Sequence, residues 1–346
     1  MDVLIRRLRQ RVIINYINLN DIFGNKINEI NEEDQYNLIE ILNEISKNNG
    51  YYINLFLKKW LQFLERNNIE IFDEYYEILS ELLSIKPLNA TDYDIISYSI
   101  NTDYKTGLDQ RILMRETPNV ISGLGTTGLR TWEASIYLSY YLLEQINLNN
   151  NKIIEIFKDK NILELGTGTG LVGMSVYKYL NDYFKKLYLT DGDSSLIDKL
   201  QFNLNLNSII SGNDKSYEDK LKCSSLWWGQ DNLPSSDINT LLAADVTYDS
   251  DVIPSLVKTI KDSMVGDKSN VEKSNVDTAI VAATVRNLKT LRTWEEHLNM
   301  GESEGIWNWQ IVDTYNSSDD NDKLHKLVWF QTFNTEIRIY RIDRII

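Results

Sequence analysis

The chain has 346 residues, of which 42% are hydrophobic and 11% aromatic, enough for one large domain or two. Its net charge of −14 disfavours broad contact with nucleic-acid phosphate and suits a basic protein partner. With a single cysteine, two histidines and no apolar run long enough to span a bilayer, we expect a cytoplasmic protein that binds no metal, membrane or nucleic acid.

Residues 1–90 carry the pattern of several amphipathic helices. Apolar residues recur at i, i+3 and i+4 in segments 4–17, 33–45, 52–64 and 72–83. The segment holds no catalytic constellation of its own, so we interpret it as a small helical domain. It either caps the core passively or docks a protein substrate, and both interpretations stay open.

Strands and helices alternate in residues 91–346. Two strands at 94–100 and 110–115 flank a turn at 105–107, and a glycine-rich segment then leads through Trp132 into a helix. Seven further strands are expected at 162–165, 186–191, 222–229, 240–245, 278–285, 307–312 and 336–342. The order predicts an α/β fold with a seven-stranded, doubly wound, Rossmann-like sheet whose last two strands pair antiparallel, and polar residues 267–275 form an insertion.

The fold is organised around residues 161–173, Asn-Ile-Leu-Glu-Leu-Gly-Thr-Gly-Thr-Gly-Leu-Val-Gly. A buried strand, a glycine turn and a helix start follow one another without a gap, which lets the backbone approach an adenosine-bearing ligand closely. Residues 168–173 also match the dinucleotide fingerprint, but the turn begins at Gly166 and follows Glu164. An acidic residue there suits a ligand with an ammonium group and no pyrophosphate, such as S-adenosylmethionine.

Acidic and aromatic residues follow the neighbouring strands. Asp191 lies 25 residues after Gly166, where nucleotide-binding sheets place a carboxylate on the ribose hydroxyls. Asp193 is an alternative, although as the N-cap of the next helix it has a structural reason to be acidic. Because ligands bind outside the carboxyl ends of the strands, one crevice should collect the glycine turn, Asp191, an indole of the 227–228 pair and Asp245.

Five segments together resemble the seven-β-strand protein lysine methyltransferases. They are residues 125–135, 163–170, 228–229, 244–248 and 284–287. Within that group the chain is most similar to the eukaryotic branch that methylates a lysine of translation elongation factor 2, which also has a helical N-terminal extension. The resemblance covers residues 90–345 by motif and the N-terminus by size and helicity.

The resemblance implies a methyltransferase domain at 91–346 after the helical domain at 1–90, with S-adenosyl-L-methionine as cofactor and elongation factor 2 as the protein partner of a monomeric enzyme. The cofactor site implied by Glu164 and the resemblance consists of Trp132, Glu164, Gly166, Thr167, Gly168, Asp191, Trp228 and Ala244. Trp227 beside Trp228 leaves the adenine-facing indole open by one residue.

Asp245 and Tyr248 match the Asp-x-x-Tyr motif that the family carries at the substrate mouth. We expect Asp245 to orient the incoming ammonium group, and Tyr248 to hydrogen-bond the amine or shape the channel. Asp245 has a structural alternative, in which it only caps the next helical turn.

Other functions share part of these signals. A nucleobase amino-methyltransferase usually has a Pro-Pro-Tyr sequence after the fourth strand, and Ala-Asp-Val-Thr-Tyr has no proline. A dinucleotide oxidoreductase needs neither Glu164 nor the two terminal strands. A methyltransferase of another protein or of a small molecule, and a non-catalytic binding protein on the same fold, remain alternatives.

Overall fold

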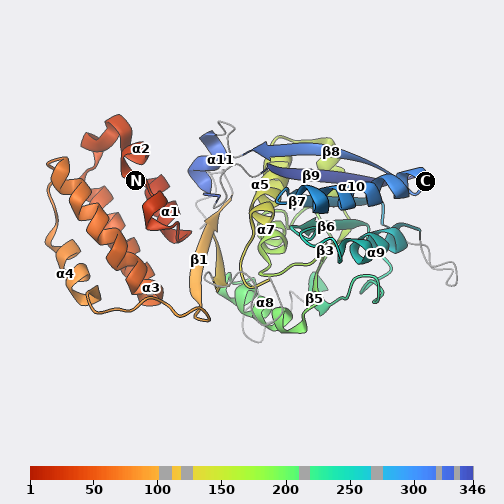
Figure 1. Cartoon of the computed structure of the whole chain (residues 1–346), viewed down its shortest axis with the longest axis horizontal. Helices are drawn as coiled ribbons and strands as arrows, with labels where there is room; N and C mark the ends of the chain where they lie inside the picture. Colours follow the sequence, from red (N-terminus) through yellow and green to blue (C-terminus); the bar gives the residue numbers. More distant parts are fainter. Residues whose placement is uncertain are drawn as a thin grey trace. The chain divides into compact units, whose positions relative to one another are not determined.

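The computed structural model describes residues 1–100, 111–117, 128–209, 219–265, 276–316, 322–330 and 336–345. The chain forms two compact units (Figure 1). One holds α1 to α4, β1, β2 and α11; the other holds α5 to α10 and β3 to β9. The expected turn at 105–107, the insertion at 267–275 and the glycines before residue 128 lie outside the described residues.

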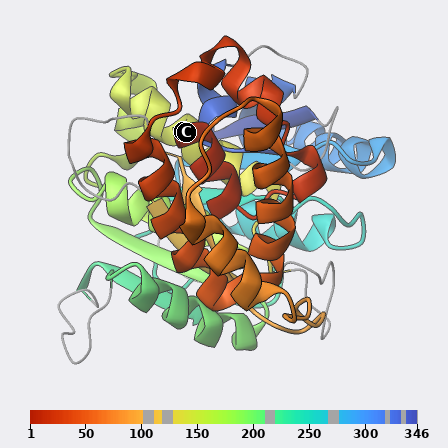
Figure 2. The same cartoon turned by 90° about the vertical axis from the view of Figure 1, so that its left-hand side faces the viewer.

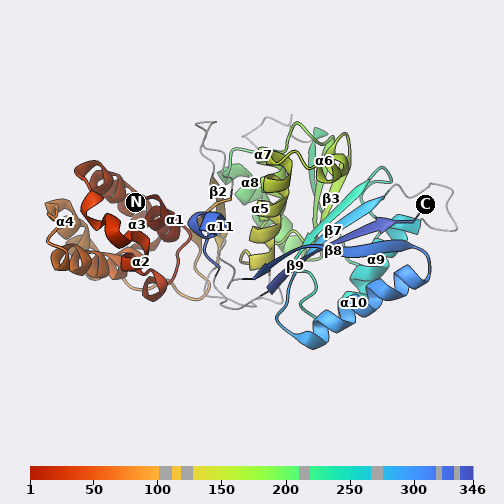
Figure 3. The same ribbon diagram turned by 90° about the horizontal axis from the view of Figure 1, so that it is seen from above.

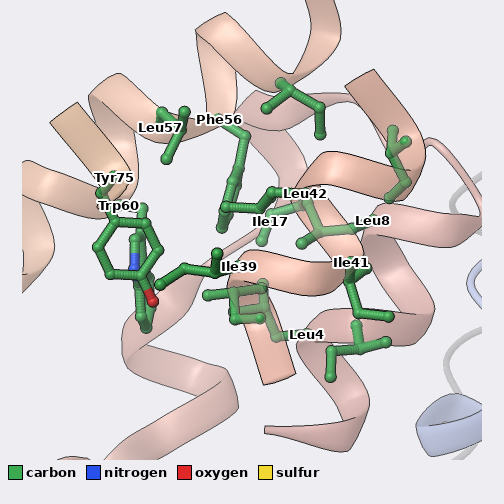
Figure 4. Close-up of a cluster of buried hydrophobic side chains, with 14 of the residues drawn as sticks. Leu4, Leu8, Ile17, Ile39, Ile41, Leu42, Phe56, Leu57, Trp60 and Tyr75 are labelled. Atoms are coloured by element: carbon green, nitrogen blue, oxygen red, sulfur yellow. The ribbon is translucent and has the colours of Figure 1, made fainter. Parts of the chain in front are cut away.

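Helices build the first unit (Figures 1 and 2). They are α1 (Asp2–Arg9), α2 (Leu19–Phe23), α3 (Glu32–Arg66) and α4 (Asp73–Leu82), with 3-10 turns η1 (Ile14–Tyr16) and η2 (Gly24–Glu29). Their apolar faces meet in one buried cluster around Trp60, Phe56 and Tyr75 (Figure 4). Asn31 begins α3 with a capping box, because its side chain accepts from the Asp34 backbone and the Asp34 carboxylate accepts from the Asn31 backbone.

Two helix boundaries in this unit differ from the sequence prediction. The helix expected over 4–17 ends at Arg9, because Arg11 takes a left-handed φ of 57° and turns its guanidinium onto Asp94 at 3.0 and 3.1 Å. The segments expected at 33–45 and 52–64 both lie in α3, which breaks at Asn49. The Asn49 amide donates to the same Asp94 over 2.7 Å, so one buried carboxylate ties both irregular positions to β1.

The antiparallel pair β1 (Asp94–Ser99) and β2 (Arg111–Glu116) confirms the two strands expected there. The helix α11 (Asp322–Leu327) was not expected, and it belongs to the first unit as well. Gln10 holds the chain just after it, since its side chain donates to the Trp329 carbonyl over 2.6 Å and accepts from the Trp329 backbone over 2.8 Å. The domain boundary at residue 90 stays a prediction.

The second unit alternates strands and helices. Its elements are α5 (Glu133–Asn147), α6 (Asn151–Phe157), β3 (Asn161–Leu165), α7 (Leu171–Tyr179), β4 (Lys186–Asp191), α8 (Ser194–Leu206), β5 (Leu221–Ser225), β6 (Thr240–Ala244), α9 (Ile253–Val265), β7 (Thr278–Thr284), α10 (Leu288–Ser303), β8 (Trp307–Asn316) and β9 (Glu336–Arg344). The helix α6 was not expected from the sequence, where the helix after Trp132 was followed only as far as Leu143.

The expected fold class is confirmed. Seven strands form one sheet in the order β5-β4-β3-β6-β7-β9-β8, in which the first five strands run parallel and β9 pairs antiparallel with both β7 and β8. The strands β3, β6 and β7 are buried on both faces, and apart from Asn161 and Glu164 of β3 apolar or small residues fill them.

Helices cover both faces of this sheet. Figure 3 shows α5 and α7 on one face and α9 and α10 on the other. Leu256, Ile260 and Trp294 of the latter pair pack on Leu163 and Leu241 of the sheet. With both faces closed, the carboxyl ends of the parallel strands are where a ligand can reach the sheet.

Candidate active site

The turn after β3 brings backbone to the carboxyl edge of the sheet. Gly166, Gly168 and Gly170 have φ values of 67°, 52° and 95°, a region that favours glycine. A Cβ atom at Gly166 would lie 2.8 Å from Val246 Cγ1, so a side chain does not fit there. A backbone hydrogen bond of 2.9 Å from the Thr167 N–H to the Thr190 carbonyl connects the turn to β4.

A pocket of about 620 Å³ opens at this edge of the sheet. Nine of the ten residues predicted for the site line it: Trp132, Gly166, Thr167, Gly168, Asp191, Trp228, Ala244, Asp245 and Tyr248. They come from the start of α5 and from the carboxyl ends of β3, β4, β5 and β6, as the parallel topology requires. The expectation of a single crevice therefore agrees with the geometry, while the role of each residue stays a proposal.

Glu164 is the predicted site residue that does not line the pocket. It is 2% exposed and points from β3 toward α7, where its carboxyl accepts a hydrogen bond of 2.8 Å from the Thr167 hydroxyl. Burial raises its pKa to about 8, although hydrogen bonds from Thr167 and from the Gly173 backbone oppose the rise. Its structure fits a group that supports the glycine turn from below.

Asp191 connects β4 to the same turn. Its carboxylate accepts from the Gly168 backbone over 2.9 Å and from the Asp193 backbone over 3.2 Å. Burial raises the pKa of Asp191, and these two hydrogen bonds counteract it. Asp193 also lines the pocket, but its side chain accepts from the Ser195 backbone over 2.8 Å and so caps α8, the structural role expected of it.

The two adjacent tryptophans line different parts of the pocket wall. Trp228 is half-buried and packs beneath the glycine turn, where a Cβ atom on Gly166 would lie 3.0 Å from its ring. Trp227 is 58% exposed and lies over Gly192, directly after Asp191. The indole Nε1 of Trp228 is buried and has no hydrogen-bond partner among the described residues.

The two residues of the Asp-x-x-Tyr motif have opposite environments. The Asp245 side chain is 4% exposed, and its backbone has a φ of 58°, a conformation uncommon outside glycine. Tyr248 is 52% exposed at the mouth of the pocket. The motif therefore places one fixed carboxylate inside the pocket and one accessible phenol at its entrance.

The sequence analysis gave no role to Arg286, which binds Asp245, or to Glu133, which binds Arg286. Arg286, after β7, donates to both carboxylate oxygens of Asp245 at 2.7 and 2.9 Å. The same guanidinium donates to Glu133, the first residue of α5, over 3.0 Å. Both residues lie in segments that the sequence analysis had singled out, next to Trp132 and in Thr-Val-Arg-Asn. The signal was present, but the pairing needed the three-dimensional fold.

The pocket has an aromatic wall and polar groups that suit a ligand containing adenosine. The turn offers backbone that a ligand can approach closely, Asp191 offers carboxylate oxygens, and Trp132, Trp227 and Trp228 offer aromatic surface. Within the described ranges, no group of three or more His, Cys, Asp or Glu side chains is placed to hold a metal ion. No helix in that part of the chain is long and apolar enough to cross a membrane.

Comparison with known proteins agrees with this geometry. Residues 121–276 match the model of a family described as lysine methyltransferase. Over 99% of both chains, the protein is 29% identical to the protein-lysine N-methyltransferase EFM3 of Saccharomyces cerevisiae. It is 31% identical to EFM3 of Chaetomium thermophilum over 65% of this chain and 62% of that one, and 27% identical to the human protein-lysine N-methyltransferase EEF2KMT over 71% and 69%.

The Rossmann-like sheet and its pocket define an S-adenosylmethionine-dependent methyltransferase. Residues 121–276 of the chain match the lysine methyltransferase family, and the enzyme class and the cofactor expected from the sequence are confirmed. The resemblance on which that expectation rested is confirmed with it.

Proposed function

We propose that the protein transfers a methyl group from S-adenosylmethionine to a lysine side chain of translation elongation factor 2. The observation that carries the proposal is the pocket in which the glycine turn and Asp191 meet Asp245 and Tyr248. Similarity along the whole chain to a protein-lysine N-methyltransferase supports a protein substrate. The cytoplasmic location and the monomeric state remain predictions.

Lysine methylation sets two requirements for the residues at the pocket. S-adenosylmethionine, when bound, supplies an electrophilic methyl group on a sulfonium. The lysine amine has a pKa of about 10.4 in water, so it must lose a proton before its lone pair can attack. Much of the rate then depends on holding the amine in line with the bond that breaks, which is a matter of fixed geometry.

The chain offers separate groups for cofactor and amine. We assign the backbone of Gly166 and Gly168 to the methionine and ribose part of the cofactor and the Asp191 carboxylate to the ribose hydroxyls. Trp132, Thr167, Trp228 and Ala244 complete the cofactor wall. Asp245 accepts an N–H of the amine and fixes its direction, because hydrogen bonds already hold its carboxylate in one orientation. Tyr248, exposed at the mouth, lines the channel through which the lysine side chain enters.

The proposal is tested by incubating the protein with methyl-labelled S-adenosylmethionine and either a whole-cell extract or purified elongation factor 2. We expect one labelled protein in the extract, with the mass of elongation factor 2, and a methylated lysine when it is analysed by mass spectrometry. The Asp245→Asn variant, which keeps the volume of the side chain, is the matched control and should lower the initial labelling rate in both samples by about two orders of magnitude.

The alternatives give different results. Label on another protein, or on a small molecule that passes a filter, replaces elongation factor 2 as the substrate. Normal binding of the cofactor in calorimetry without any transfer indicates a non-catalytic binding protein.

A further inference from the structure

The carboxylate of Asp245 accepts three hydrogen bonds from two side chains. Arg286 Nη1 donates to Oδ1 over 2.7 Å, Nη2 donates to Oδ2 over 2.9 Å, and the Thr284 hydroxyl donates to Oδ2 over 3.0 Å. The arginine contact is bidentate, the geometry in which a guanidinium and a carboxylate bind most strongly. Asp245 is therefore a buried carboxylate with a fixed plane and a directly paired charge.

The other side of Arg286 faces the start of α5. Its Nη2 donates to Glu133 over 3.0 Å, and its guanidinium carbon lies 4.9 Å from the centre of the Trp132 ring. Arg130 lies 4.5 Å from the same ring centre and 3.9 Å from Glu133. Among the described residues, Arg130, Arg286, Glu133 and Asp245 thus form one cluster of two positive and two negative side chains.

The surrounding carboxylates stabilise the charged form of Arg286. Burial disfavours the charged guanidinium, but the hydrogen bonds and charges of Asp245 and Glu133 outweigh it and raise the pKa of Arg286. A buried ion pair of this kind is weak as a general source of stability. Its position beside Asp245, whose φ of 58° is itself uncommon, points instead to a function in the pocket.

An amine that must be neutral to react presents a difficulty for a carboxylate binding site. A negative charge next to a lysine amine favours the ammonium form and raises the amine pKa. A carboxylate whose charge is balanced by a bound guanidinium raises it much less. An ionised carboxylate offers about four lone-pair positions, so about one remains for an N–H of the substrate beside the three that Arg286 and Thr284 occupy.

We propose that Arg286 is a positioning residue for methyl transfer, which fixes the Asp245 carboxylate and balances its charge so that the substrate lysine loses its proton more readily at the site. This inference rests on the proposed function. Among the described residues, the other charged or titratable groups at the pocket are Tyr248 and Asp251 after β6, Asp191 and Asp193 after β4, and Arg130 and Glu133 near the start of α5. None of them is changed in the variants below.

The test is the pH dependence of methyl transfer in the full-length protein. Initial rates of label transfer from S-adenosylmethionine to total cell-extract protein are measured from pH 7 to 10, with background subtracted, so the readout does not depend on which protein is the substrate. Replacing the guanidinium in Arg286→Met leaves Asp245 unbalanced. We expect the rising limb of the pH–rate curve to move up by about one pH unit, within the range for a nearby charge.

Two further variants separate charge from structure. The pair Asp245→Asn with Arg286→Met removes both charges and should return the limb to the wild-type pH, although the rate stays low. Arg338 lies on β9, outside the pocket lining, and donates to Glu295 of α10 over 2.8 Å. Arg338→Met should therefore leave the pH–rate curve unchanged. Cofactor affinity of Arg286→Met should stay within about threefold of wild type, since its carboxylate partners do not include Asp191.

Each outcome is decisive. A rate loss in Arg286→Met that is equal at every pH, or a shifted limb that the double variant does not restore, overturns the inference. Label on a protein other than elongation factor 2, together with the shifted limb, contradicts only the proposed substrate. An unlabelled extract with the wild-type protein overturns both.

Discussion

The hydroxyl of Thr167 donates a 2.8 Å hydrogen bond to the carboxyl of Glu164, so that one residue of the cofactor turn rests on the buried end of the strand before it. Glu164 is 2% exposed and sits below the pocket. The turn that we assign to the cofactor is therefore supported by a carboxyl that does not line the pocket.

This relationship predicts a pH-dependent stability. The pKa of Glu164 rises from 4.5 to about 8 on folding, so between these values the folded protein binds a proton that the unfolded chain has released. The stabilisation linked to this proton is fully present below pH 4.5 and is lost as the pH rises to about 8. Glu164→Gln carries no charge at any pH, and its unfolding free energy relative to wild type should increase by a few kcal/mol between pH 5 and pH 9.

Urea unfolding of both proteins at pH 5 and pH 9, without added cofactor, measures this change. Glu296→Gln, at an exposed position on α10, is the control and should follow wild type at both pH values. Stability curves for Glu164→Gln and wild type that run parallel across the range would show that Glu164 is charged in the folded protein at neutral pH.

Asp191 should matter for the cofactor more than Asp193 does. Asp191→Ala removes the proposed ribose acceptor and the acceptor of the Gly168 backbone N–H, so S-adenosylmethionine should bind about 1–3 kcal/mol more weakly in calorimetry. Asp191→Asn keeps one acceptor oxygen and should lose less. Asp193→Ala removes the N-cap of α8 and should lower stability by about 1 kcal/mol with little change in affinity. A larger affinity loss for Asp193→Ala would transfer the ribose contact to that residue.

The two indoles should separate in the same measurement. Trp228 packs beneath Gly166 and has a buried Nε1, whereas Trp227 is 58% exposed over Gly192. We expect Trp228→Ala to weaken cofactor binding tenfold or more, because an aromatic wall of the pocket is lost, at about 1.4 kcal/mol per factor of ten. Trp227→Ala should change the affinity less than about threefold. The reverse order would make Trp227 the adenine-facing residue.

Much of this fold can be predicted from the sequence, because its strongest signals are local. The strand, glycine turn and helix start at residues 161–173 are contiguous, and β6 and β7 are short buried runs that are each followed by a helix. Once the strands are parallel and ordered, their carboxyl ends must gather Asp191 and Asp245 at one edge. The boundary errors arose where a distant partner decides the backbone, as at Arg11 and its carboxylate Asp94.

The finer parts of the site depended on side-chain direction, which residue spacing does not fix. Glu164 and Asp245 are both acidic residues at strand ends, yet one points under the turn and the other turns at a positive φ toward Arg286. Arg286 lies 41 residues from Asp245 in the chain. Only the pairing of β6 with β7 brings the segments that carry them together.

The helical unit offers a test of the docking interpretation. On α4, Tyr75 and Ile78 face the core while Glu77 and Glu81, one turn apart, are exposed. If a basic protein docks on this face, Glu77→Lys with Glu81→Lys should lower kcat/KM for the protein substrate about tenfold at low salt, less at high salt, and leave cofactor affinity unchanged. Glu296→Lys with Glu302→Lys makes the same charge change on α10 and is the control. Equal effects of the two pairs would favour a passive cap.

Point variants suit this question better than truncation. Removing residues 1–90 would strip α11 and the following Trp329 of their partners in α1 and Gln10, which are in the same compact unit. A truncated protein would then expose apolar surface for reasons unrelated to docking.

The sharpest separation of chemistry from binding comes from Asp245. Asp245→Asn keeps the side-chain volume and an acceptor for the Thr284 hydroxyl, but it loses the charge that holds Arg286 and reduces the acceptors that direct the amine. Methyl transfer should fall by about two orders of magnitude or more, since a displacement of about 1 Å at the reacting group has that effect.

The affinity of Asp245→Asn for S-adenosylmethionine should change little, because the glycine turn, Asp191 and both indoles keep their contacts. Tyr248→Phe should lose less activity, because the exposed ring still lines the channel. Calorimetry and single-turnover label transfer on the same samples separate the two effects. If Asp245→Asn loses cofactor affinity as severely as activity, the residue belongs to the cofactor site or to the fold; if it loses neither, the Asp-x-x-Tyr assignment is wrong.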